Sequence, residues 1–142
     1  KALVKGLGKK PKEVYKSRDY MAVFENKKDI ENLDLNMEQL KKLDDFVIVT
    51  APGETCDFVS RFFAPTIGIK EDPVTGSAHC TLVPYWRNRL NKNNFEALQL
   101  SKRGGKLICS YLGDKIEISG KAVTYLKGDI FINKKYDKNT KI

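Results

Sequence analysis

The segment of residues 77–90 constrains the fold more than any other part of this sequence. It has the length of a helix, but its apolar side chains spread around the helical wheel instead of forming one stripe. These side chains are Ala78, Cys80, Leu82, Val83, Tyr85 and Trp86. A helix of this kind must be covered on most sides. We therefore expect its first half, including Cys80, to lie in the core, with strands around it.

Short runs rich in β-branched and aromatic residues lie on both sides of this segment and predict the strands. Asn36 is placed to cap a short amphipathic helix that contains Met37 and Leu40. Glycine-containing turns separate the later runs, which indicates an antiparallel meander. The predicted strands occupy residues 19–24, 46–50, 57–63, 97–100, 106–111, 115–119 and 122–126, with residues 129–132 as a further candidate. The sequence therefore predicts an α+β domain with mostly antiparallel strands around a central helix.

The size of the chain is that of one domain. Its 142 residues, 41% of them hydrophobic, can bury a core without disulfide or metal support. Residues 2–7, followed by Gly8, are typical of the last turns of a helix that began upstream, which suggests a fragment. Residues 133–142 form a polar, lysine-rich end that we expect to fray.

The sequence shows neither a membrane span nor an export signal. No run approaches the roughly 18 consecutive apolar residues that a span needs, and no charged leader precedes a cleavage site. The cysteines Cys56, Cys80 and Cys109 are widely separated and form no CxxC pair. We therefore expect free thiols in a cytoplasmic protein, with no membrane partner and no metal site.

The net charge of +8 raises the question of nucleic-acid binding, because neutralising phosphates strengthens such complexes. Only five of the 26 basic residues are arginine, and lysine lacks the planar fork that binds phosphate with two parallel hydrogen bonds. The lysines are also dispersed among 18 acidic residues. The charge pattern is that of a solvated surface, and we expect no nucleic-acid partner.

Chemistry is indicated by the residues just before the central helix. Asp72 precedes a proline, which favours an extended backbone. Thr75, Gly76 and Ser77 then offer free backbone N–H groups at the positive end of the helix dipole, which is a ready site for a carboxylate. Asp72 beside that site could move a proton on the bound molecule. The residues alone leave another interpretation open, in which Asp72 is a helix cap and Gly76 a turn residue.

The run of residues 71–79, Glu-Asp-Pro-Val-Thr-Gly-Ser-Ala-His, resembles the signature of the PhzF-like family of phenazine biosynthesis. Residues 57–65, 101–105 and 118–123 resemble that family in the same order, as does the run of residues 11–15 near the start. The resemblance covers essentially the whole chain.

The resemblance implies a fold similar to that of diaminopimelate epimerase, with a barrel-like, mostly antiparallel sheet wrapped round a central helix in each of two domains. Residues 1–142 would be the C-terminal domain. The implied function is a cofactor-independent isomerase that moves a proton on a small carboxylate substrate, in the best-known member a dihydro-hydroxyanthranilate. The principal acid/base glutamate and a Gly-His-Pro segment would belong to the missing N-terminal domain, so we expect this chain alone to be almost inactive.

The resemblance also implies roles for individual residues of the site. Asp72 would be the catalytic carboxylate of this domain, and Gly76 and Ser77 would bind the substrate carboxylate. Thr75 and His79 are further candidates for shaping the substrate site, although a lone imidazole is more often structural. Glu71 beside the signature should not be mistaken for the principal glutamate. No metal or cofactor is implied.

Two alternatives remain open at this point. The chain could be a non-catalytic domain that binds a ligand or associates with itself, and we expect a homodimer in either case. An amino-acid racemase or epimerase of the same fold would use two cysteine bases, and Asp72 argues against it.

Overall fold

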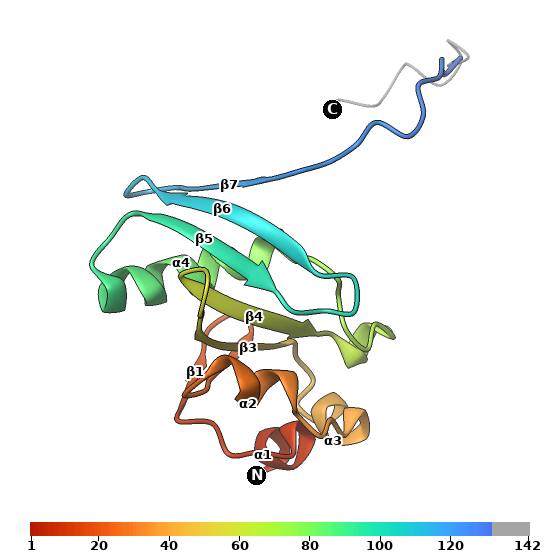
Figure 1. Ribbon diagram of the computed structural model, residues 1–142. Helices are drawn as coiled ribbons and strands as arrows, with labels where there is room; N and C mark the ends of the chain where they lie inside the picture. Colours follow the sequence, from red (N-terminus) through yellow and green to blue (C-terminus); the bar gives the residue numbers. More distant parts are fainter. Residues whose placement is uncertain (132–142) are drawn as a thin grey trace.

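The computed structural model describes residues 1–131. Seven strands form one curved sheet in the order β1-β2-β3-β4-β5-β6-β7 (Figure 1). Neighbouring strands are antiparallel except for the pairs β2–β3 and β4–β5, which are parallel. The expected α+β class with a mostly antiparallel sheet is confirmed. The strands are β1 (Glu13–Lys16), β2 (Tyr20–Val23), β3 (Val47–Pro52), β4 (Phe58–Phe63), β5 (Asn94–Gln99), β6 (Gly105–Tyr111) and β7 (Ile116–Gly120).

The two parallel pairs are joined by helical crossovers, as parallel strands require. The short helices α2 (Lys27–Glu31) and α3 (Met37–Lys41) connect β2 to β3. A 3₁₀ turn, η1 (Pro65–Ile67), and the long helix α4 (Gly76–Leu90) connect β4 to β5. The helix α1 (Ala2–Leu7) precedes the sheet and ends at Gly8, whose φ of 67° is the left-handed cap expected there.

The core lies on both faces of β3 and β4, because alternate side chains of a strand point to opposite faces. On one face, Ile48, Phe58 and Phe62 pack against α4. On the other face, Val47, Val49, Val59 and Phe63 join a second cluster with side chains of α1, α2 and α3. The two central strands are therefore buried on both sides, which explains their continuous apolar sequence.

The short helices begin where the sequence offers caps. The Asn36 side chain accepts a hydrogen bond from the Gln39 amide at 3.0 Å, so the predicted start of α3 is confirmed. Asn26 caps α2 in the same way through the Asp29 amide. Helices of five residues form here because these caps and the buried side chains of Ile30 and Leu40 stabilise them.

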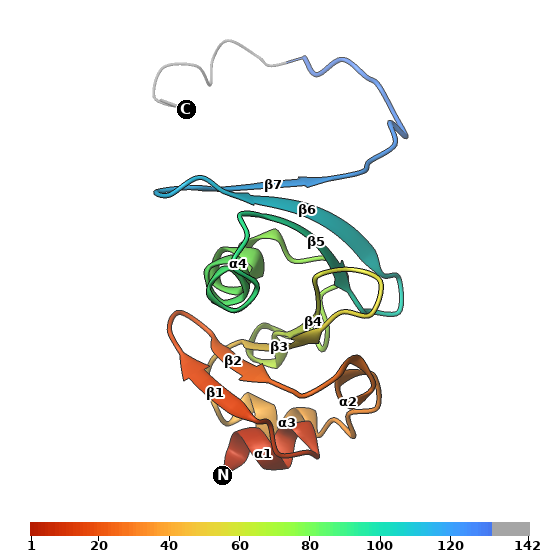
Figure 2. The same ribbon diagram turned by 60° about the vertical axis from the view of Figure 1, so that its left-hand side comes forward.

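Helix α4 lies in the concave side of the sheet (Figure 2). The indole N–H of Trp86 donates to Thr50 Oγ1 at 3.0 Å, and its ring stacks on Phe58. This contact fixes the helix against the middle of the sheet. The buried side chains of α4 are Ala78, His79, Leu82, Val83 and Trp86.

The expectation that the first half of α4 would be buried on most sides is wrong. Its buried residues lie on one face, whereas Ser77 and Cys80 are exposed. Cys80 was expected in the core, but the side of the helix on which it lies has no strand over it. Within residues 1–131 the edge strands β1 and β7 do not pair with each other, so the sheet stays open and is not a closed barrel.

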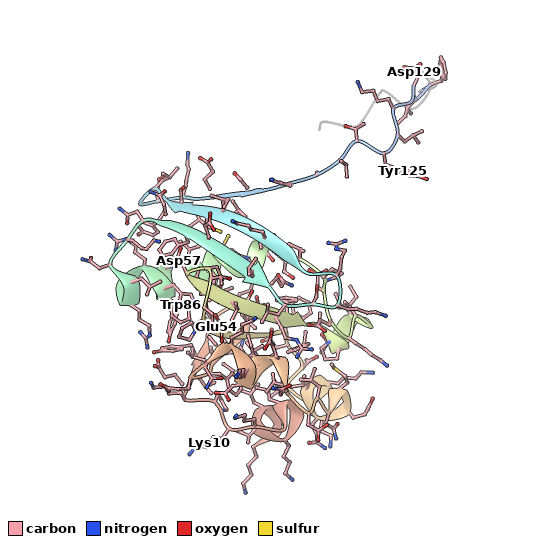
Figure 3. The ribbon with its side chains drawn as sticks, in the orientation of Figure 1. Lys10, Glu54, Asp57, Trp86, Tyr125 and Asp129 are labelled. Carbon is pink, nitrogen blue, oxygen red and sulfur yellow. The ribbon has the colours of Figure 1, made fainter. Side chains whose placement is uncertain are left out.

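The predicted strand at residues 122–126 does not form. Residues 121–131 run on as an extended segment without strand pairing, and Figure 3 shows Tyr125 and Asp129 away from the sheet. The apolar side chains of this segment are almost fully exposed: Val123, Tyr125, Leu126, Ile130 and Phe131. A β-prone sequence needs a partner strand to complete its hydrogen bonds, and the described residues supply none. Residue 132 and the expected frayed end at residues 133–142 lie outside the described part.

Two further observations concern the cysteines and the helices. Cys56, Cys80 and Cys109 are all free thiols. Among the helices of residues 1–131, none has the length and apolar character to cross a lipid bilayer.

Candidate active site

The signature residues form a loop that leads from the end of β4 to the start of α4. The Asp72 amide donates to the Phe62 carbonyl at 2.9 Å, which holds the loop against the end of β4. The other contacts of this loop come from β5 and from the turn that follows β5. The loop is therefore held at its start by one parallel strand and along its length by the other.

Gln99, the last residue of β5, clamps the loop from inside the protein. The residue is only 1% exposed. The amide nitrogen donates to the Asp72 carbonyl at 2.7 Å and to Thr75 Oγ1 at 3.2 Å. The amide oxygen accepts from the Thr75 backbone N–H at 2.7 Å. One buried side chain thus fixes the backbone on both sides of the Pro73–Val74 step.

The turn between β5 and β6 provides a second clamp. Ser101 Oγ donates to the Pro73 carbonyl at 2.7 Å and accepts from the Gly104 amide at 3.0 Å. Gly105 packs so closely on the loop that a Cβ there would lie 2.2 Å from a methyl group of Val74. Only glycine allows this approach. The loop and the turn therefore form one connected unit.

The start of α4 is open to solvent and has no cap. Within residues 1–131, no hydrogen-bond partner is found for the amides of Gly76, Ser77 and Ala78, and the Thr75 side chain makes no capping bond. A Cβ added at Gly76 would meet nothing within 4 Å. These amides lie at the positive end of a 15-residue helix, so they can bind an anion that approaches from outside.

The Asp72 carboxylate does not cap the helix. Thr75 Oγ1 donates to Asp72 Oδ2, and the same hydroxyl accepts from Gln99. Asp72 is half-buried, and its second oxygen has no hydrogen bond within residues 1–131. The capping interpretation left open by the sequence therefore does not describe this side chain. Asp72 is instead a carboxylate held by a hydroxyl beside a free helix start.

Arg18, from the turn between β1 and β2, also reaches the helix start, and sequence reasoning missed it. Its Nη2 donates to Ser77 Oγ at 3.2 Å and to Asp19 Oδ2 at 2.7 Å. The hydrogen bond with Asp19, whose side chain is only 1% exposed, raises the pKa of Arg18. Arg18 and Ser77 are 59 residues apart, and no local sequence pattern signals the contact. The contact places a guanidinium group, ion-paired with Asp19, beside the free amides.

His79 and Glu71 are both engaged elsewhere. His79 is fully buried: its Nδ1 lies 2.9 Å from the Thr75 carbonyl, and its Nε2 has no partner within the described residues. Burial lowers the pKa of this imidazole. The Glu71 carboxylate accepts two hydrogen bonds from Arg61, at 2.7 and 3.1 Å. Glu71 is thus engaged by Arg61, and the expectation that it is not the principal glutamate of the family stays a prediction.

The buried imidazole predicts a specific pH dependence of stability. The pKa of His79 is lower in the folded state than in the unfolded state, so below its ordinary value of 6.5 the unfolded state binds more protons. The contribution of neutral His79 to the free energy of unfolding is therefore fully present above pH 6.5. This contribution is lost as the pH falls below 6.5, by up to about 1.4 kcal/mol per pH unit. His79 is the only histidine in the sequence. Urea unfolding at several pH values should show this slope, and His79→Phe should remove it. An equal slope in the variant would contradict the assignment.

The fold and the site together define a class: an α+β domain in which an uncapped helix start, a feature suited to anion binding, lies next to a carboxylate. The profile of the family described as phenazine biosynthesis-like protein matches residues 2–128. The chain belongs to this PhzF-like family.

Several relatives illustrate the match. An uncharacterized isomerase of Pseudomonas aeruginosa is 44% identical over 131 residues, covering 92% of this chain and 51% of that protein. The human phenazine biosynthesis-like domain-containing protein is 40% identical over 117 residues, 74% of this chain and 41% of that protein. A crystal structure of a PhzF family protein from Enterococcus faecalis superposes with a TM-score of 0.85 at 41% identity, over 92% of this chain and 51% of that one. The chain thus spans about half the length of relatives that it matches along most of its own length.

Proposed function

We propose that this chain forms one half of the active site of an isomerase that moves a proton on a small carboxylate-bearing substrate. The observation that carries the proposal is the free, uncapped start of α4, with the Asp72 carboxylate on the loop immediately before it. Two relatives, from Pseudomonas aeruginosa and Halalkalibacterium halodurans, are named uncharacterized isomerases, which supports this class of reaction.

The proposed mechanism assigns binding and proton transfer to different groups. The substrate carboxylate accepts hydrogen bonds from the amides of Gly76 and Ser77, and the Arg18 guanidinium, which is paired with Asp19, adds a charged hydrogen-bond donor beside them. Bound there, the substrate presents a carbon near its carboxylate to Asp72, which takes a proton from it or delivers one to it. Thr75 holds the Asp72 carboxylate in place through its hydroxyl. This scheme uses only side chains and backbone groups and needs no cofactor.

A second proton carrier must come from outside this chain in the proposed scheme. Moving a proton from one carbon to another is efficient when an acid and a base act on different positions of the substrate. Within residues 1–131, Glu71 is paired with Arg61 and His79 is buried. We propose that this chain is the C-terminal half of a two-domain protein, referred to below as the longer protein, and that the other half supplies the second carrier, a glutamate.

Exchange of substrate hydrogen with solvent tests the function. The longer protein, incubated in D₂O with a panel of ring and open-chain carboxylates, should incorporate deuterium at carbon, which mass spectrometry detects. The 142-residue chain alone should do so at least about 100-fold more slowly, because one proton carrier is absent. Equal exchange by both proteins would contradict the two-part site. Absence of exchange in the longer protein across the panel would contradict the isomerase itself.

A second candidate function, self-association, is favoured by the segment of residues 121–131. Tyr125 is 99% exposed and Phe131 is 95% exposed, and the neighbouring edge of β7 has no partner strand within residues 1–131. An extended apolar segment beside a free sheet edge is suited to pairing with another copy. In this interpretation the chain is a homodimer whether or not it is catalytic.

Light scattering tests the association. The chain is expected to dimerise, whereas a chain that ends at Gly120 is expected to stay monomeric at the same concentration. Replacement of the exposed Lys115, in the turn between β6 and β7 at the other end of these strands, by alanine is a control and should leave the dimer intact. A monomeric parent chain at high concentration, or a dimer that survives the truncation, would contradict this role of the segment.

A further inference from the structure

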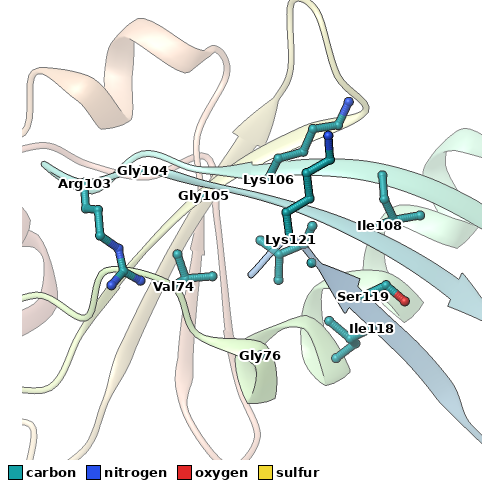
Figure 4. Close-up of a pocket in the computed structure, with 12 residues that line it drawn as sticks. Val74, Gly76, Arg103, Gly104, Gly105, Lys106, Ile108, Ile118, Ser119 and Lys121 are labelled. Atoms are coloured by element: carbon teal, nitrogen blue, oxygen red, sulfur yellow. The ribbon is translucent and has the colours of Figure 1, made fainter. Parts of the chain in front are cut away.

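An open cavity of about 840 Å³ lies beside the start of α4 (Figure 4). Its walls come from the signature loop, the turn between β5 and β6, strand β6 and strand β7. Gly76 is one of the lining residues, so the cavity lies directly beside the proposed carboxylate site. A substrate held at Gly76 would extend into this space.

The cavity has an apolar lining and a basic rim. Val74, Leu107 and Ile118 supply apolar side chains, and Leu107 is only 4% exposed. The charged residues that line the cavity are Arg103, Lys106 and Lys121, all of them basic. A carboxylate from the solvent would thus meet positive charge and no repulsion from the described walls.

The side chain of Arg103 points in a different direction from those of Lys106 and Lys121. Figure 4 shows its guanidinium pointing to the side of the sheet on which Val74 lies, whereas the amino ends of Lys106 and Lys121 point the opposite way. Lys106 is also paired with Glu96 at 2.7 Å. Arg103 makes no ion pair or hydrogen bond within residues 1–131.

The backbone that carries Arg103 is fixed relative to the anion site. Gly104 has a φ of 70°, and its amide is bound to Ser101, which in turn binds the Pro73 carbonyl. Gly105 contacts Val74, two residues before Gly76. The distance between the Arg103 backbone and the free amides is therefore set by the same contacts that hold the signature loop.

We propose that Arg103 binds a second anionic group of the substrate, and that the substrate class is a small molecule with two acidic groups separated by an apolar or ring-shaped body. This inference rests on the proposed function for its first anion site at Gly76 and Ser77. The apolar body lies on Val74, Leu107 and Ile118, and the planar guanidinium pairs with the far carboxylate or phosphate through two parallel hydrogen bonds. Arg103 thereby selects dianionic molecules over their singly charged analogues.

Titration of the isotope-labelled chain with two probes tests the proposal. Benzoate carries one carboxylate, and benzene-1,3-dicarboxylate carries a second one across the same ring. Both should shift the amide NMR signals of Gly76 and Ser77, and the dicarboxylate should also shift those of Gly104 and Gly105. We expect the dicarboxylate to bind about tenfold more tightly, as one added charge-assisted contact would provide. Arg103→Met should abolish this advantage, whereas Lys121→Met, which removes the same charge from the same cavity, should preserve it.

The outcomes separate the two claims. If the two probes bind equally, or if both variants weaken the dicarboxylate equally, Arg103 is not a specific subsite and the inference fails, while the carboxylate site at Gly76 stands. If neither probe shifts Gly76 and Ser77, the inference and the proposed carboxylate site both fail. Gly76→Ala should weaken both probes without unfolding the chain, because its added methyl group meets no protein atom within 4 Å and would occupy the approach to the amides.

Discussion

Replacement of Asp72 by asparagine in the longer protein is expected to slow deuterium exchange at the substrate carbon by about 100-fold or more. Asparagine has nearly the same shape and can still accept a hydrogen bond from Thr75, but it cannot take or give a proton. The affinity for the substrate carboxylate should change little, because the groups proposed to bind it are Gly76, Ser77 and Arg18. The effect should therefore appear in kcat and not in KM.

The matched control for this variant is Asp114→Asn, which makes the same chemical change in the exposed turn between β6 and β7. It should leave both kinetic constants unchanged. If Asp72→Asn lost activity only in proportion to a loss of folded protein, its role would be structural. An exchange rate equal to that of the parent would remove Asp72 from the mechanism.

Replacement of Gln99 by leucine is expected to destabilise the chain by roughly 2–5 kcal/mol, because it leaves one buried and one partly buried backbone group without partners. These are the Thr75 N–H and the Asp72 carbonyl, each bound to Gln99 at 2.7 Å. Protein that remains folded should also exchange hydrogen more slowly, since the loop that carries Asp72 is no longer held. Urea unfolding gives the first quantity, and the exchange assay corrected for the folded fraction gives the second.

Gln39→Leu is the matched control for the clamp. Gln39 is the only other glutamine in the sequence, and its half-buried side chain makes no hydrogen bond within residues 1–131. This variant should change the free energy of unfolding by less than about 0.5 kcal/mol. A similarly small change for Gln99→Leu would show that the loop does not depend on the clamp.

Much of the fold could be predicted because it follows from local sequence. The runs at residues 46–50 and 57–63 correspond to β3 and β4, since their β-branched and aromatic side chains suit strands buried on both faces. The start of α3 at Asn36 is likewise determined locally, by the hydrogen bond from the Gln39 backbone amide to the Asn36 side chain. The resemblance to the PhzF-like family is confirmed by the match over residues 2–128.

The failures concern properties that depend on distant parts of the chain. The burial expected for Cys80 requires a strand over that side of α4, and the order of strands within residues 1–131 leaves it uncovered. The strand expected at residues 122–126 has the right composition but no partner. Arg18 could not be found because its contact with Ser77 spans 59 residues. Gln99 did leave a signal, a polar residue that continues the inward-facing alternation of Phe95 and Ala97 in β5.

The parallel pairing of β4 with β5 also sets the order in which the parts of the molecule can form. The fully buried members of the cluster between the sheet and α1, α2 and α3 all precede residue 64, so they can gather before the rest of the chain has been made. The loop at residues 72–75 must wait for Gln99, which follows it by 24 residues or more and reaches it only after α4 has brought β5 back beside β4. Closing such a loop costs chain entropy that only later contacts offset. A partly folded chain would thus contain the cluster next to α1, α2 and α3 but not the candidate site. The site would form only when β5 has paired with β4.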